Sequence, residues 1–116
     1  MSRVTLEIPL IPPSVNMYVR HTRTGRHYVT REAKAFKEAL ALFAHGQCVQ
    51  AKKYKVSVCI YLGHGQRGDI DNFQKVILDG LADAGVIKSD AKIETLNIHK
   101  SRDRENPRTV ITVEEI

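Results

Sequence analysis

In the sequence VSVCIYL at residues 56–62, every second residue is aliphatic: Val56, Val58, Ile60 and Leu62. This period of two predicts a β-strand that turns one face toward a core. Residues 63–68 predict a loop, and residues 72–84 then predict a helix that ends at Gly85. Its apolar face consists of Phe73, Val76, Ile77, Leu81 and Ala84.

Similar patterns continue outward to both ends of the chain. Residues 4–8 alternate and predict a strand that is ended by prolines, and residues 18–30 predict a short hairpin around Thr24-Gly25. Thr30 is a suitable N-cap for a helix that stops near Gly46. Residues 93–100 and 108–114 predict two closing strands around a turn with Asn106-Pro107. The apolar face of the first helix consists of Ala33, Phe36, Leu40 and Phe43.

The predicted order of elements is β, hairpin, α, β, α, β, β. Because the strands do not alternate strictly with helices, we expect an α+β fold in which two helices pack on a mixed or mainly antiparallel sheet. A chain of 116 residues is long enough for one domain with its own core. We therefore predict a single domain over residues 1–116.

Composition narrows the class of protein. No apolar run is long enough to span a membrane, no signal peptide is expected, and Cys48 and Cys59 form no CxxC pair. We therefore expect a reduced, cytoplasmic protein without structural zinc. The chain carries 18 Lys and Arg against 13 Asp and Glu, for a net charge of +5, which favours a nucleic-acid partner.

The charges are unevenly distributed. Residues 18–37 carry a net charge of +5, equal to that of the whole chain, whereas residues 69–90 contain five aspartates and two lysines. Asp69 and Asp71 lie where a loop enters a helix, and Asp71 alone could be an N-cap, with Gln74 three residues later. That explanation leaves Asp69 without a role.

Clustered carboxylates suit Mg²⁺ or Mn²⁺, which take oxygen ligands and also bind phosphate. Such an ion would reconcile an acidic cluster with a polyanionic partner and would activate water for hydrolysis. Lys75 follows Asp71 by one helical turn. It could form an ion pair with Asp71 or Asp79, or it could stabilise the negative charge that develops on phosphate.

Four blocks occur in a fixed order: residues 68–75 (GDIDNFQK), 78–81 (LDGL), 84–87 (AGVI) and 90–93 (DAKI). Together with Pro12-Pro13-Ser14-Val15-Asn16 and the nearby Tyr18, Arg20 and His21, they resemble the RusA family of Holliday junction resolvases over nearly the whole chain.

The resemblance implies a homodimeric, Mg²⁺-dependent endodeoxyribonuclease that makes paired cuts in four-way junction DNA during recombination and repair. Mn²⁺ is expected to substitute for Mg²⁺. By position, Asp69, Asp71 and Asp90 resemble the catalytic, metal-binding aspartates, and Lys75 resembles the essential lysine. The family commonly has two adjacent acids where this chain has Ser89-Asp90, and we align Asp90 with the second.

Several polar residues are candidates for contacts with the DNA backbone, which position a duplex without reading its sequence. Two asparagines are expected to orient ligands or substrate. The full set of DNA-binding candidates is Asn16, Arg20, Arg23, Arg26, Arg31, Arg67 and Asn72.

A helix over residues 72–84 would place its ends roughly 18–20 Å apart. The six residues that lead to Asp90 reach about 20 Å when fully extended, so Asp90 can barely return to Asp69 and Asp71. This limited reach favours metal sites shared between the two chains of a dimer. A shorter helix with a loop that doubles back is the alternative.

Two other functions fit the same sequence features. One is a non-catalytic protein that binds branched DNA through the basic surface. The other is a metal-dependent nuclease that acts on forks or flaps rather than four-way junctions.

Overall fold

The central stretch folds into strand β4 (Tyr54–Leu62), in which every second side chain is buried, as predicted. The coordinates are a computed structural model that describes residues 3–13, 19–21, 27–66 and 70–116, without the side chains of residues 19–21, 27–29, 71 and 72. Strand β4 lies inside a four-stranded sheet of order β1-β6-β4-β5. The segment between β4 and β5 carries most of the predicted acidic residues.

The sheet is mixed. Strand β6 (Arg108–Glu115) pairs antiparallel with both β1 (Arg3–Ile8) and β4, whereas β5 (Ile93–Arg102) pairs parallel with β4 along one edge of the sheet. A parallel pair needs a long crossover between its strands, and the second helix provides it. The predicted α+β class, with two helices on a mixed and mainly antiparallel sheet, is confirmed.

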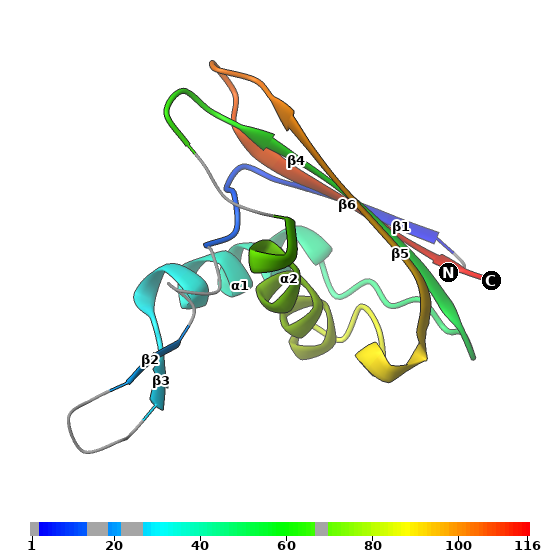
Figure 1. The fold of residues 1–116 in the computed structure, drawn as a ribbon. Helices are drawn as coiled ribbons and strands as arrows, with labels where there is room; N and C mark the ends of the chain where they lie inside the picture. The colour runs from blue at the N-terminus through cyan, green and yellow to red at the C-terminus, as the bar shows by residue number, and fades with distance from the viewer. Residues whose placement is uncertain (1–2, 14–18, 22–26, 67–69) are drawn as a thin grey trace.

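Helices α1 (Arg31–Ala44) and α2 (Ile70–Asp83) lie on the same side of this sheet (Figure 1). Their apolar faces join the buried side chains of β1, β4 and β6 in one core. Three residues of the connecting segments, Val49, Val86 and Ile87, are buried in the same core. The buried residues of the two helices are Ala33, Phe36, Leu40, Ala44, Phe73, Val76, Ile77 and Leu81.

The predicted N-cap of α1 is confirmed, and so is its predicted apolar face except at one position. The Thr30 side chain accepts a hydrogen bond from the backbone N–H of Ala33, as expected for an N-cap. Phe43, in contrast, is 38% exposed, and Ala44 is buried in its place. The reason is that Ala33, Phe36, Leu40 and Ala44 follow the helical period, so the buried face has rotated past Phe43 by the last turn.

The predicted hairpin is present as β2 (Val19–His21) paired antiparallel with β3 (His27–Val29). Its expected turn at Thr24-Gly25 lies outside the described residues. In Figure 1 this hairpin projects away from the sheet, beyond the start of α1. The observed element order therefore matches the predicted one, with a short 3₁₀ helix, η2 (Asp90–Lys92), added before β5.

The two helices approach each other closely at Gly80. A Cβ atom there would lie 3.1 Å from Cδ1 of Leu40, which is closer than ordinary van der Waals contact. At the same contact, Lys37 Nζ lies 3.1 Å from Asp83 Oδ2. Glycine in the middle of α2 thus serves the packing of α1 against α2.

Two expectations from composition can be compared with the structure. Cys48 and Cys59 are both free thiols. Among the described residues, no helix combines the length and the apolar character that a membrane crossing requires.

Candidate active site on helix α2

Helix α2 is buried along one face and carries a polar stripe along the other. Asp71, Lys75 and Asp79 follow one another at intervals of four residues, which places them on the same side of a helix. Asp71 is the second residue of α2, inside the helix, so it is not the N-cap. The capping explanation for Asp71 therefore fails, and the stripe requires another one.

A surface pocket of about 370 Å³ lies against this stripe. It is formed by one face of α2 and the beginning of η2. Its lining residues are Gln74, Lys75, Leu78, Asp79 and Asp90. The structure thus brings Lys75 and Asp90, two residues predicted from the sequence, to one pocket of one chain.

Asp90 reaches the pocket because the chain reverses sharply after α2. The backbone N–H of Gly85 donates to the carbonyl of Ala82, and that of Val86 donates to the carbonyl of Leu81. These two bonds, with Gly85 at a φ of +77°, form a Schellman motif, which favours glycine. The reversal places Asp90 opposite the middle of α2, so the chain returns over less than the full length of the helix.

The buried Tyr54 holds the segment that leads to Asp90 through hydrogen bonds of its hydroxyl. The Tyr54 hydroxyl donates to the carbonyl of Val49 at 2.8 Å and accepts from the backbone N–H of Lys88 at 3.3 Å. Val49 in turn donates its N–H to the carbonyl of Val86. The Tyr54 side chain is fully buried, and its bond to Lys88 holds the backbone two residues before Asp90.

Ser89, which stands where the resemblance leads us to expect an acid, has a local structural role. Its side chain accepts a hydrogen bond from the backbone N–H of Ala91 at 3.2 Å and caps η2. Serine and aspartate are both good N-caps, so either residue can start this turn. Asp90 is the first residue of η2 and is exposed at the rim of the pocket.

Lys75 forms the ion pair that the sequence offered as one alternative. Its Nζ lies 3.6 Å from Asp79 Oδ2, four residues along the helix, and the Lys75 side chain is 60% exposed. An exposed pair of this kind contributes only about 0.3–0.5 kcal/mol. A stronger anion, such as a phosphate, can therefore compete with Asp79 for Lys75.

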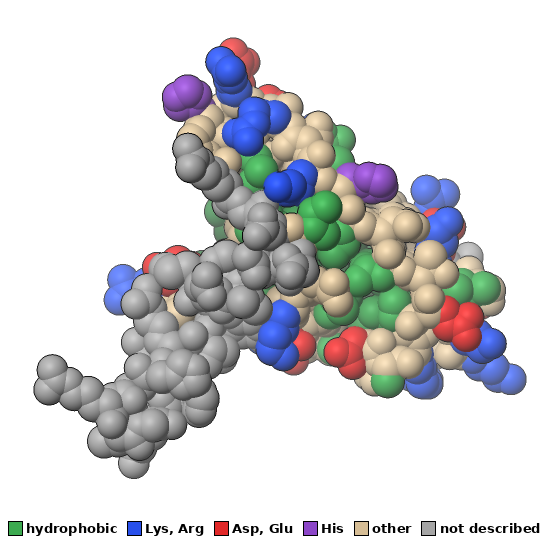
Figure 2. All heavy atoms as spheres, in the orientation of Figure 1, with side chains coloured by type: hydrophobic (Ala, Val, Ile, Leu, Met, Phe, Trp, Pro, Cys, Tyr) green, Lys and Arg blue, Asp and Glu red, His purple; other side chains and the backbone are tan. Residues whose placement is uncertain are grey.

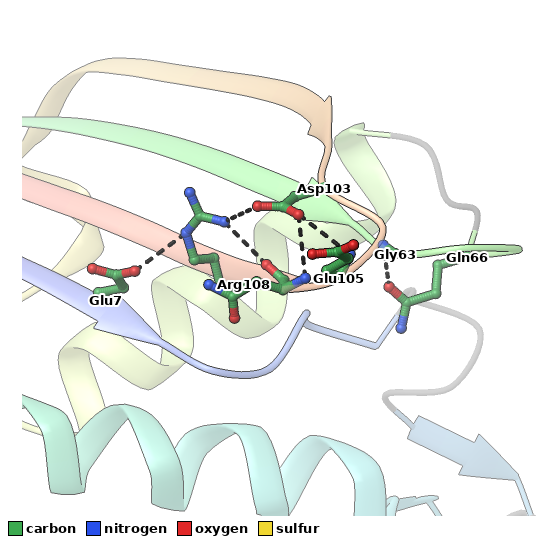
Figure 3. A network of polar contacts seen from close by, with 7 residues as sticks. Glu7, Gly63, Gln66, Asp103, Glu105 and Arg108 are labelled. Carbon is green, nitrogen blue, oxygen red and sulfur yellow. Dashed lines mark hydrogen bonds and ion pairs between the residues drawn. The ribbon is translucent and has the colours of Figure 1, made fainter.

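The loop between β4 and α2 is fastened where it leaves the sheet. Arg102 Nη1 donates to the carbonyls of Gly63 at 2.9 Å and Gln66 at 3.4 Å. The Gln66 side chain turns back and accepts from the Gly63 backbone N–H (Figure 3). The end of β5 thus holds the described part of this loop, which extends to Gln66.

The structure describes only some of the other predicted site residues. Arg31 is exposed at the first position of α1. The backbones of Arg20, Asp71 and Asn72 are described, in β2 and α2, but their side chains are not. Asn16, Arg23, Arg26, Arg67 and Asp69 lie outside the described residues. Within the described part of the chain, no group of three acidic, His or Cys side chains is placed to hold a metal ion.

Asp79 lines the pocket but was not among the site residues predicted from the sequence. It was considered only as an ion-pair partner of Lys75. The signal for it was present, because a second step of four residues from Asp71 leads through Lys75 to Asp79 on the same helix face.

Comparison with known proteins identifies the family of this chain. The family model described as "Endodeoxyribonuclease RusA" matches residues 9–114. The chain belongs to the RusA family. Among relatives, the "Crossover junction endodeoxyribonuclease rusA" of Enterobacteria phage 82 is 30% identical over 108 residues, which cover 90% of this chain and 89% of the relative. The corresponding protein of Escherichia coli strain K12 is 29% identical over an alignment that covers all of this chain and 98% of the relative, and that of Shigella sonnei strain Ss046 is 27% identical over the same shares.

The structure gives two of the sequence blocks that resemble the RusA family a role in building the site. In the second block, Gly80 permits the contact with α1 and Asp79 faces the pocket. In the third block, Gly85 reverses the chain and Val86 and Ile87 anchor it in the core. These two blocks therefore deliver Asp90, in the fourth block, to the polar face of α2.

Proposed function

We propose that this protein is a crossover junction endodeoxyribonuclease that hydrolyses phosphodiester bonds in four-way junction DNA with the help of Mg²⁺, and that it serves DNA recombination and repair. Its relatives carry the first part of this description in their names. The observation that supports the proposal most strongly is the convergence of Lys75, Asp79 and Asp90 on one pocket, beside the helix turn that carries Asp71.

The donor atoms around the pocket suit a hard divalent cation. Its two acidic residues, Asp79 and Asp90, offer only oxygen ligands, and none of the described residues that line it is His or Cys. Asp69, Asp71 and Asp90 would hold the ion, with Mn²⁺ as a substitute. When bound, a divalent cation offsets the charge of the scissile phosphate and makes water more acidic.

The lysine of the site acts on the phosphate itself. Lys75 Nζ is kept near the pocket by Asp79, through a pair weak enough to be replaced. A phosphate at the pocket would attract the ammonium group away from Asp79. Lys75 would then stabilise the negative charge that develops on the phosphate oxygens and the leaving oxygen during cleavage.

The basic candidates would position the DNA. Arg31 is exposed at the start of α1, immediately after the hairpin segment that contains Arg20, Arg23 and Arg26. We propose that these residues, with Arg67, contact the phosphate backbone. Asn16 and Asn72 would orient DNA or ligands near the acidic residues.

We also propose a homodimer, because two-fold symmetry presents two sites to a junction that has the same approximate symmetry. Within this dimer we propose that each metal site belongs to one chain, in place of the shared site that the estimated reach of the chain up to Asp90 favoured. The support is that Asp90 and the α2 residues Gln74, Lys75 and Asp79 line a single pocket without a second chain.

The test is cleavage of a synthetic four-way junction in Mg²⁺ by the Asp71→Asn variant, with protein added to equal occupancy of the DNA. We expect at least a hundredfold loss of cutting, because the variant loses a metal ligand but keeps the fold. Forks and linear duplex at the same salt concentration serve as competing substrates. Undiminished cutting by Asp71→Asn would overturn the proposal, and absence of cutting by the unmodified chain would favour a non-catalytic DNA-binding protein.

A further inference from the structure

A second surface pocket, of about 440 Å³, adjoins η2 and has no lining residue in common with the pocket beside α2. Three segments that are distant in the sequence form it: the chain before β4, the segment from α2 into η2, and the end of β6. Figure 2 shows Lys and Arg side chains that project at the lower right, the corner where β4 and β5 begin in Figure 1. Because Lys52, Lys88 and Lys92 line this pocket, we call it the lysine pocket.

The positive charge of the lysine pocket is in excess. All three lysines are exposed, and their side chains form no ion pair or hydrogen bond with any residue that the structure describes. Glu115 is the one acidic side chain among the lining residues, so three positive charges stand against one negative charge. A terminal carboxylate at Ile116 would still leave the cations in excess. Glu94, two residues after the last of these lysines, is paired with Lys53 at 3.1 Å.

The lysine pocket and the candidate active site share residues 88–92, a segment that the structure describes throughout. Asp90 lines the active-site pocket, whereas Lys88 and Lys92, two residues to either side, line the lysine pocket. Two residues span at most about 7 Å between Cα atoms. Successive phosphates of one DNA strand are about 3.4 Å apart along the helix axis. A strand with one phosphate beside Asp90 therefore carries its next one or two phosphates within reach of these lysines.

The backbone that carries the two lysines is held in place. The N–H of Lys88 donates to the hydroxyl of the buried Tyr54 at 3.3 Å, and the N–H of Lys92 donates to the carbonyl of Ser89 at 3.2 Å. The ammonium groups at the ends of the side chains are free to adjust, because a lysine stem has four rotatable carbons. The pocket thus combines a fixed backbone with movable charges, which suits an anion of the DNA backbone.

We propose that the lysine pocket binds a backbone phosphate of the DNA strand, next to the phosphate that is cut beside Asp90. This inference rests on the proposed function. Lysine binds phosphate as a point charge, and none of the residues that line the pocket is aromatic, so the pocket offers charge without a surface on which a base could stack. The contact would position the strand without reading its sequence.

The first experiment measures binding of a four-way junction in EDTA over a range of salt concentrations, so that cutting does not interfere. The main variant is Lys88→Gln with Lys92→Gln. The matched control, Arg3→Gln with Lys55→Gln, removes the same charge. Both control residues are exposed and pair with Glu114 in neighbouring strands, on the face of the sheet turned away from the helices. Lys52→Gln is a second variant, in a different segment, so a local change in η2 cannot explain its effect.

We expect the slope of log K against log salt to become shallower by about 0.9 for each bound chain in the main variant, because one phosphate contact is lost. Binding at about 0.1 M salt should weaken roughly five- to tenfold, and Lys52→Gln should shift it in the same direction by less. The control should keep the slope of the unmodified chain. If both lysine variants behave like the control while the unmodified chain binds and cuts, the lysine pocket is refuted and the nuclease stands. If the unmodified chain does not bind the junction, both proposals fail.

The second experiment locates the phosphate. The cut is first mapped on the junction, and each of the two phosphates on either side of it is then replaced, one at a time, by an uncharged methylphosphonate. At one of these positions the replacement should weaken binding of the unmodified chain roughly fivefold and leave binding of the Lys88→Gln, Lys92→Gln variant unchanged. Equal weakening of both proteins at every position would show that the pocket takes no phosphate beside the cut, and would overturn the inference.

Discussion

Helices α1 and α2 are each 14 residues long and pack on the same face of one sheet, yet they differ in what their exposed sides meet. The exposed side of α1 carries mixed charges in solvent, such as Glu32, Lys34 and Glu38. The exposed side of α2 meets η2, and Lys75, Asp79 and Asp90 gather in the pocket between them. The two helices thus pack on the sheet in the same way, but only α2 contributes to the candidate site.

The difference arises after each helix ends. After α1, His45 and Gly46 both adopt positive φ angles, and the chain moves on toward β4. After α2, the turn at Gly85 sends the chain back along the helix, and Tyr54 holds the returning backbone. A helix face becomes a candidate site here because a second segment is fixed against it.

The largest effect on cutting is expected from a substitution in the pocket beside α2. Asp90→Asn should reduce junction cutting at least a hundredfold, because it removes a negatively charged ligand while keeping the side-chain shape. Asp83→Asn, at the end of α2 outside the pocket, should cut at nearly the unmodified rate, since it loses only its surface pair with Lys37. Cleavage rates at equal DNA occupancy measure both, and equal rates for the two variants would contradict the distinction.

A smaller effect is expected where the returning segment is fixed. Tyr54→Phe removes one hydroxyl that bonds to Val49 and Lys88, and it should lower the free energy of unfolding by about 1–2 kcal/mol. It should also slow cutting, because the backbone before Asp90 loses its support. Urea unfolding and cleavage assays provide the two readouts.

Tyr61→Phe is the matched control in the same strand. The Tyr61 ring lies 3.9 Å from the Arg108 guanidinium, and a phenyl ring can keep that contact. The control should stay within about 0.5 kcal/mol of the unmodified chain. If Tyr54→Phe behaves like the control in both assays, then Tyr54 does not support Asp90.

The smallest effect lies far from α2, at Asp103. Its pKa is lowered from 3.8, first by the hydrogen bond from Arg108, so the ionised form stabilises the fold. This stability is fully present above about pH 3.8 and is lost as pH falls through the lower pKa of the folded state.

Asp103→Asn should therefore be less stable than the unmodified chain at pH 7, and the gap should close in strongly acidic solution. Urea unfolding at a series of pH values measures the gap. A gap that does not depend on pH would show that the ionised carboxylate is not its origin, and cutting at pH 7 should be unaffected in either case.

Local patterns in the sequence were sufficient for most of the fold. Alternation located β4, Thr30 located the start of α1, and Gly85 located the end of α2, because each signal acts over a few residues. Phe43 was misplaced because a choice between neighbouring positions on a helix depends on what packs there. The insertion of β6 between β1 and β4 comes from contacts between distant segments, which no local pattern contains.

For the candidate site, the sequence was better at naming residues than at arranging them. Lys75 and Asp90 were predicted and lie at one pocket, whereas Asp79 was recognised only as an ion-pair partner. The path of residues 84–90 was estimated from chain length alone. The backbone bonds at Gly85 and the Tyr54 hydroxyl, which determine that path, depend on tertiary contacts.

The most direct test is a crystal structure of the protein soaked in Mn²⁺, with the ion located by its anomalous scattering. We predict one ion beside α2 in contact with the carboxylates of Asp71 and Asp90 of the same chain, each within about 2.5 Å. An ion that contacts Asp71 but takes its Asp90 from a second chain, or that binds without Asp90, would contradict a site built by one chain.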